Sequence, residues 1–208
     1  MSKIVLTISL IFLLWSCNSS EKRHINDGIN EIEISTKTIQ EANRSLNSID
    51  NKINTLRRTK PIKKDELIKV FPKEILSFVR TEYHNEQSNT TMDIVIGDAT
   101  YNDHDKKINV TITDGAGETG SAMVSIMMIA LHSDIKKIHD NGFEETGILH
   151  GRRAIFKEER LIKDNSSKIS CSIQYITRDR YAISLSSDHI KLDELKKFNQ
   201  YLKLDQLP

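Results

Sequence analysis

The sequence predicts an α+β fold in which an antiparallel sheet of about six to seven strands carries a long helix on one face. Three observations lead to this prediction. Short segments with alternating apolar residues are joined by turn-forming residues, which is typical of hairpin-linked strands. One long apolar segment interrupts these strands and has helical character. Upstream of them, a heptad pattern predicts an amphipathic, coiled-coil-like helix.

The first residues have the features of an export signal. Lys3 precedes an apolar run over residues 4–15, which is shorter than the about 20 residues that a membrane-spanning helix needs. A run of this length fits the apolar region of a signal peptide. It ends in the motif LWSC at residues 14–17, which resembles the lipobox of bacterial lipoproteins. That resemblance implies removal of the signal peptide, residues 1–16, and lipidation of Cys17, which would anchor the chain to the cell membrane.

Two alternatives to this interpretation stay open. The segment could be an ordinary cleaved signal peptide with an incidental cysteine, or an uncleaved anchor. Asn18 follows the cysteine. In lipoproteins of cells with two membranes, an aspartate at this position commonly signals retention in the inner membrane, so the resemblance favours the outer membrane.

A polar tether over residues 17–28 is expected to lead into a helical stalk over residues 29–60, which Pro61 stops. The stalk is predicted from apolar residues that recur every seven positions. Its stripe either forms an oligomeric coiled coil through residues 29–58, giving a homo-oligomer, or packs onto the chain's own domain. The cationic junction RRTKPIKK, residues 57–64, is interpreted as a solvated hinge, or alternatively as a contact with anionic lipid headgroups. The first heptad positions are Ile25, Ile32, Ile39, Leu46 and Ile53, and the second, three residues later, are Gly28, Ser35, Ala42, Ile49 and Leu56.

Residues 61–208 are expected to form one globular domain. A short helix within residues 65–72, ended by Pro72, comes first, and the long helix is predicted over 119–138. Strands are predicted within 75–84, 90–102, 106–115, 142–162 (one or two strands), 168–177 and 180–187. The last segment, residues 188–204, predicts an amphipathic helix whose apolar stripe is Leu192, Leu195, Phe198 and Leu202.

This order of elements resembles the Mog1/PsbP-like α+β domains. It is also similar to exported bacterial proteins in which Phe71-Pro72, the segment TITDG at 111–115 and a methionine-rich helix would have counterparts. Neither resemblance implies a catalytic residue.

A G-x-G-x-x-G pattern at Gly115, Gly117 and Gly120 raises the alternative of a dinucleotide-binding loop. Its context argues against that function, because the strand before it is the second arm of a predicted hairpin rather than part of a β-α-β unit. Glu118 would also repel a phosphate, and Asp140, the candidate ribose ligand, lies in a predicted turn. We therefore expect a turn whose helix is capped by Glu118 and by Thr119 or Ser121.

The helix after this turn contains Met123, Met127 and Met128, which either pack in the core or line a ligand- or partner-binding surface. Cys171 lies in an alternating segment and is expected to be a small buried core residue. The seven histidines show no metal-ligand spacing, and neither a metal site nor a cofactor is predicted.

The balanced charge, +1 at pH 7, argues against a nucleic-acid-binding protein. No motif of a hydrolase, metalloprotease or nucleotide-binding enzyme is present. The sequence therefore predicts a lipid-anchored cell-envelope protein that is not an enzyme and acts as a binding or accessory module, for an apolar ligand or an envelope protein partner. The alternatives are a structural spacer that oligomerises through its stalk, or an enzyme of unrecognised mechanism.

Overall fold

A computed structural model describes residues 44, 46–87, 94–163 and 166–208. The chain divides into two units, Met1–Asn47 and Ser48–Pro208. In the first unit only Arg44, Leu46 and Asn47 are described, and they are helical. The predicted signal peptide, Cys17, the tether and the stalk before residue 44 thus lie outside the described residues. The second unit begins with a helix over residues 48–58 and contains all the strands described below.

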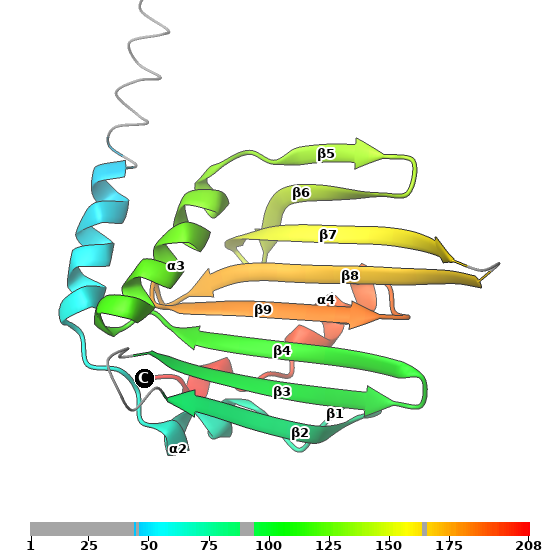
Figure 1. The fold of residues 1–208 in the computed structure, drawn as a ribbon, viewed down its shortest axis with the longest axis horizontal. Helices are drawn as coiled ribbons and strands as arrows, with labels where there is room; N and C mark the ends of the chain where they lie inside the picture. The colour runs from blue at the N-terminus through cyan, green and yellow to red at the C-terminus, as the bar shows by residue number, and fades with distance from the viewer. Residues whose placement is uncertain (1–43, 45, 88–93, 164–165) are drawn as a thin grey trace, which may run out of the picture. The chain divides into compact units, whose positions relative to one another are not determined.

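The second unit is built on one nine-stranded antiparallel sheet with the order β1-β2-β3-β4-β9-β8-β7-β6-β5 (Figure 1). Two meanders, β1–β4 and β5–β9, meet where β4 pairs with β9, with Asp114 opposite Tyr181. The helix α3 (Gly117–His132) carries the chain from the centre of the sheet to its far edge. The strands are β1 (Glu74–Ile75), β2 (Phe78–Gln87), β3 (Val95–Asp103), β4 (Lys106–Asp114), β5 (Lys136–His139), β6 (Gly142–Leu149), β7 (Arg152–Lys163), β8 (Ser166–Thr177) and β9 (Tyr181–Asp188).

The α+β class and the large antiparallel sheet are confirmed, but the prediction of about six to seven strands was too low. Two short edge strands were missed. β1 has two residues, and all four residues of β5 are exposed, so neither strand shows the alternation that reveals a half-buried strand. Because β5 was missed, the long helix was predicted to continue to residue 138, whereas α3 ends at His132.

One side of the sheet, here called the closed face, holds the main hydrophobic core. The helix α4 (Leu192–Asn199) packs on β7, β8 and β9 there, and the predicted stripe of Leu192, Leu195, Phe198 and Leu202 is buried, as expected. Phe198 makes edge-on ring contacts with Phe78 and Tyr101, at centroid distances of 5.6 and 5.1 Å. The short helices α2 (Lys64–Leu67), η2 (Ile68–Val70) and η3 (Leu204–Gln206) complete this layer.

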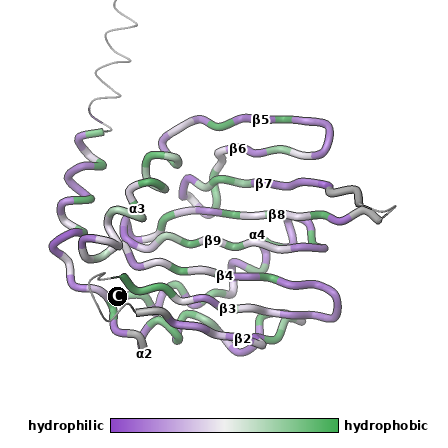
Figure 2. Tube along the Cα trace, in the orientation of Figure 1, coloured by the Kyte–Doolittle hydropathy of each residue, from purple (hydrophilic) through white to green (hydrophobic). Residues whose placement is uncertain are grey.

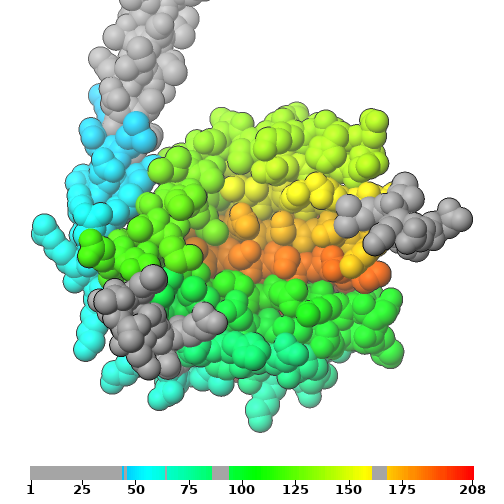
Figure 3. All heavy atoms as spheres, viewed as in Figure 1, coloured from blue at the N-terminus to red at the C-terminus, as the bar shows by residue number. Residues whose placement is uncertain are grey.

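The other side, here called the open face, carries α3 near one end of the strands (Figure 1). A smaller apolar cluster lies under it, in which Ile49 and Leu56 of the 48–58 helix pack with Val124, Met128 and Ala182. Of the described heptad positions, Ile49, Ile53 and Leu56 thus pack onto the chain's own domain, whereas Leu46 is 52% exposed. Beyond α3 the atoms of β8 and β9 lie at the surface (Figure 3), so this part of the face is uncovered.

The glycine-containing turn is structural. β4 is an arm of the β3–β4 hairpin, as predicted, and three backbone N–H groups of the turn are engaged: Gly115 donates to the Arg180 carbonyl at 3.0 Å, Ala116 to Asp114 Oδ1 at 3.0 Å, and Gly117 to the Thr59 carbonyl at 3.1 Å. A phosphate bound at these three N–H groups would have to displace these bonds.

The predicted side-chain cap of α3 was wrong, although Glu118 does lie in the first turn of the helix. Ala116 is the N-cap and no side chain caps it, while the Ser121 hydroxyl donates to the Glu118 carbonyl instead. Gly117 has φ +82°, a left-handed conformation that glycine adopts without strain, and the engaged backbone groups replace the side-chain cap.

Candidate functional site

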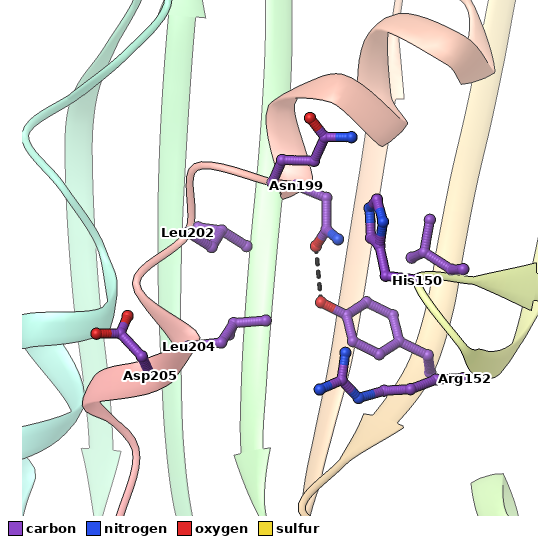
Figure 4. A pocket seen from close by; sticks show the side chains of 9 residues that line it. His150, Arg152, Asn199, Leu202, Leu204 and Asp205 are labelled. Carbon is purple, nitrogen blue, oxygen red and sulfur yellow. Dashed lines mark hydrogen bonds between the residues drawn. The ribbon is translucent and has the colours of Figure 1, made fainter.

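A cleft of about 400 Å³ opens on the closed face, between the β6–β7 turn, β7, β8 and the C-terminal end of α4 (Figure 4). We call it the Tyr175 cleft. Its volume falls in the range of small-molecule sites. It is lined by Leu149, His150, Arg152, Tyr175, Asn199, Gln200, Leu202, Leu204 and Asp205.

The base of the cleft is a buried polar pair. The Tyr175 hydroxyl donates to Asn199 Oδ1 at 2.7 Å, and the two residues are only 1% and 4% exposed. Alternation along β8 turns Tyr175, with Ile173, toward α4, and Asn199 is the last residue of that helix. Burial raises the pKa of Tyr175 to about 12. The phenol therefore stays protonated at neutral pH and acts as a hydrogen-bond donor, not as a base.

One wall of the cleft carries positive charge and hydrogen-bond donors. The β6–β7 turn has left-handed backbone at His150 (φ +48°) and Gly151 (φ +78°) and presents the exposed side chains of His150 and Arg152. Neither side chain makes a hydrogen bond or ion pair with any residue that the structure describes. The Arg152 guanidinium acts only at a distance, where its charge partly offsets the rise in the pKa of Tyr175.

The opposite wall is largely apolar. Figure 4 shows Leu202 and Leu204 across the cleft from His150 and Arg152, with Asp205 at the rim. Arg178 Nη2 holds this segment by donating to the Asp205 backbone carbonyl at 3.2 Å. The cleft therefore combines an unpaired guanidinium, two polar groups at its base and a leucine wall. These features suit a small molecule with one anionic group and an apolar body.

A second cavity of about 230 Å³, here called the helix crevice, lies between the 48–58 helix, α3 and the ends of β7 and β8. Most of its charged groups are already paired. Lys52 Nζ lies 2.8 Å from Asp179 Oδ1, and Arg153 donates to the Leu131 carbonyl and, at 2.7 Å, to Asp134 Oδ1. Arg152 also borders this cavity.

The three methionines singled out in the sequence do not converge on one cavity. Met128 is 4% exposed, belongs to the cluster under α3 and lines the helix crevice. Met127 is half-buried against the same cluster, and Met123 is 46% exposed on the outer side of α3. Cys17, the predicted lipidation site, lies outside the described residues.

Sequence reasoning missed a buried ion pair between Asp114 and Arg180. Asp114 is fully buried and accepts hydrogen bonds from Arg180 Nε (2.6 Å) and Nη2 (2.8 Å) and from the backbone N–H groups of Ile62 and Ala116. Arg180 Nη2 also donates to the Lys60 carbonyl at 3.1 Å. The backbone of the junction, interpreted from sequence as a solvated hinge, is thus tied to the sheet, although Arg57, Arg58 and Lys63 are exposed.

Cys171 and the Asp103–His104 turn are placed as expected. Cys171 is 2% exposed, its Sγ contacts the Ile190 carbonyl at 3.4 Å, and burial raises its pKa to about 12. Asp103 and His104 pair with each other in the exposed β3–β4 turn. Among the described residues, no group of three or more His, Cys, Asp or Glu side chains is placed to hold a metal ion, and no helix has the length and hydropathy of a membrane span.

The signals for the cleft were present in the sequence but dispersed. The HGRR segment at 150–153 marks a turn with clustered cations, which could have been noted as a candidate anion site. Comparison with known proteins adds no assignment: no protein-family profile matches the chain, and no curated protein matches its sequence. Its function is therefore inferred from the geometry of its own residues.

Proposed function

We propose that this protein is a lipid-anchored cell-envelope protein whose α+β domain is a non-enzymatic binding module for a small amphipathic anion. Acylated Cys17 would tether the chain to the cell membrane, and to the outer membrane where the cell has two. The Tyr175 cleft would hold the ligand. The support for the tether is the LWSC motif after an apolar run too short to span a bilayer.

One observation is the main support for a binding role. The Arg152 guanidinium has no hydrogen-bond or ion-pair partner among the described residues. It lies beside the buried Tyr175–Asn199 pair and opposite the leucine wall. A carboxylate is the anion whose geometry best matches a guanidinium, because two parallel N–H···O bonds can form. The apolar body of the ligand would lie against Leu149, Leu202 and Leu204.

The protonation of the buried groups supports binding over catalysis. The pKa of Tyr175 and that of Cys171 are both raised to about 12, so neither supplies a base or a thiolate at neutral pH. The spacer alternative is supported less, because Ile49 and Leu56 of the proposed coiled-coil stripe are buried against their own domain.

Octanoate is a suitable probe for the test, because it has a carboxylate and an apolar chain. We expect it to bind the full-length protein saturably and to raise its melting temperature. Octanol lacks the charge and acetate lacks the chain, so both are expected to bind much more weakly. Titration would be followed by calorimetry and by the thermal shift.

Two variants locate the site. Arg152→Gln is expected to weaken octanoate binding by about ten-fold or more, since a charge-assisted hydrogen bond contributes roughly 1.5–3 kcal/mol. Tyr175→Phe should also weaken it, whereas Arg160→Gln, at the other end of β7, and Lys52→Gln, in the helix crevice, should not. Equal binding by wild type and Arg152→Gln, or loss of binding in Lys52→Gln alone, would exclude the Tyr175 cleft as the site.

A further inference from the structure

The outer side of α3 is an exposed apolar surface without charge. Met123, Ile126 and Ile129 are 46%, 71% and 52% exposed, and no residue between Glu118 and His132 is charged. The second half of the helix is hydrophobic along its length (Figure 2), and α3 lies at the surface in the space-filling view (Figure 3). Exposed apolar patches of this kind usually mark an interaction site.

We infer that this face of α3 binds the same face of a second copy of the chain, as an antiparallel, two-fold helix pair centred on Ile126. The spacing of the side chains is self-complementary. Ala122, Ile126 and Ala130 follow one another at intervals of four residues, which is the row that forms a ridge on a helix surface. A two-fold axis at Ile126 sets the two isoleucines beside each other and places Ala122 of each helix opposite Ala130 of the other, where the small side chains let the two helices approach closely.

The absence of charge decides between a second copy and other occupants. Two copies of an uncharged face meet without like-charge repulsion, and the two-fold dimer is the commonest symmetric assembly. A helix that lies on a membrane surface instead carries basic residues beside its apolar face. α3 has none, and the exposed Glu118 at its start would be repelled by anionic lipids. A charged protein partner would find no ion-pair partner within this face.

The rest of the molecule offers matched reference positions. Ile138 on β5 and Ile148 on β6 are 74% and 67% exposed, so they are as accessible as Ile126. They are single residues beside charged neighbours: Ile138 lies between Lys137 and His139, and Ile148 pairs across the strands with Arg153. Neither belongs to a continuous apolar face. The proposed interface is also independent of the Tyr175 cleft, which opens on the other side of the sheet.

Cysteine crosslinking in intact cells tests the inference on the full chain. Ile126→Cys is expected to give a disulfide-linked dimer under mild oxidation, because a residue on the axis brings the two Cβ atoms within disulfide range. Ile138→Cys and Ile148→Cys should give no dimer above the wild-type background. The native Cys171 is buried and has a raised pKa, so it should not contribute.

Sedimentation of the detergent-solubilised full chain gives an independent measurement. Wild type and Ile148→Glu are expected to be dimers, whereas Ile126→Glu should be a monomer with an unchanged circular dichroism spectrum, because the substituted side chain is exposed. Similar crosslinking at all three positions, or a monomeric wild type, would overturn the inference. Crosslinking of Ile126→Cys to a protein of another mass would assign the face to a different partner, and labelling of that cysteine by a lipid-phase reagent would assign it to the membrane.

Discussion

The two faces of the nine-stranded sheet use alternate residues of the same strands but have different chemistry. The closed face buries the aromatic rings of Tyr101, Tyr175 and Tyr181 under α4 and the C-terminal segment. The open face carries rows of hydroxyl and amide side chains, such as Asn109, Ser186 and Ser172 on β4, β9 and β8, which lie opposite one another in register.

Polar side chains of the open face form hydrogen bonds with one another. Thr100 donates to Asn109 Oδ1 at 3.2 Å, and Thr111 donates to Asp98 Oδ1 at 2.5 Å. Hydrogen bonds between exposed or partly exposed side chains of this kind contribute little to stability. The free energy of folding therefore comes mainly from the closed face. The proposed binding surfaces lie where α4 ends and where α3 is itself exposed.

The largest expected effect is on the closed face. Phe198→Ala removes a fully buried ring from its edge-on contacts with Phe78 and Tyr101, and should lower the free energy of unfolding by about 3–5 kcal/mol. Urea unfolding of the full chain measures it. A loss below about 1 kcal/mol would mean that the closed face is not the main source of stability.

Asp114→Ala is expected to lower the free energy of unfolding by about 3 kcal/mol. The substitution leaves Arg180 without its buried counter-ion and two backbone N–H groups without an acceptor. The double variant Asp114→Ala/Arg180→Met should be less destabilised than the sum of the single changes. Strict additivity in this double-mutant cycle would show that the two side chains do not act as a pair.

The raised pKa of Tyr175 is expected to lower the free energy of unfolding by about 2 kcal/mol at alkaline pH. Its pKa is raised from 10.0 to about 12, so above pH 10 the unfolded chain loses this proton while the folded chain keeps it. The stabilisation is fully present below pH 10 and is lost as the pH rises through 12. Tyr175→Phe should therefore show a shallower fall in stability over this range. Parallel pH profiles for the two proteins would contradict the assignment.

The smallest effect is expected on the open face. Ser184, on β9, lies opposite Thr111 of β4 and Gln174 of β8. Ser184→Ala should change the free energy of unfolding by less than about 0.5 kcal/mol. Chemical denaturation under the same conditions as for Phe198→Ala provides the measurement. A loss comparable to that of Phe198→Ala would remove the distinction between the faces.

Much of the closed face could be predicted from the sequence. Alternating apolar residues identified β3, β4, β8 and β9, and the spacing of Leu192, Leu195, Phe198 and Leu202 identified α4 and its buried side. These patterns arise because one side of each element is buried. The edge strands β1 and β5 lack such a pattern, and β5 is exposed at every residue, so pattern analysis assigned its residues to the preceding helix.

The candidate sites depend on contacts that no local pattern encodes. Asp114 and Arg180 meet because β4 pairs with β9 across the junction of two meanders, 66 residues apart in the chain. The Tyr175 cleft combines a turn at residues 149–152, a strand residue and the segment after α4. Only the strand order brings these segments together, and that order was not predicted from the sequence.

We propose above all that the α+β domain is held at a membrane by a lipid on Cys17. Intact-mass and peptide mass spectrometry of the protein isolated from its native membranes test this claim most directly. We expect a chain that begins at residue 17, with residues 1–16 removed and the cysteine carrying fatty acyl groups. A native chain with a free thiol at Cys17, or one that retains residues 1–16, would contradict it.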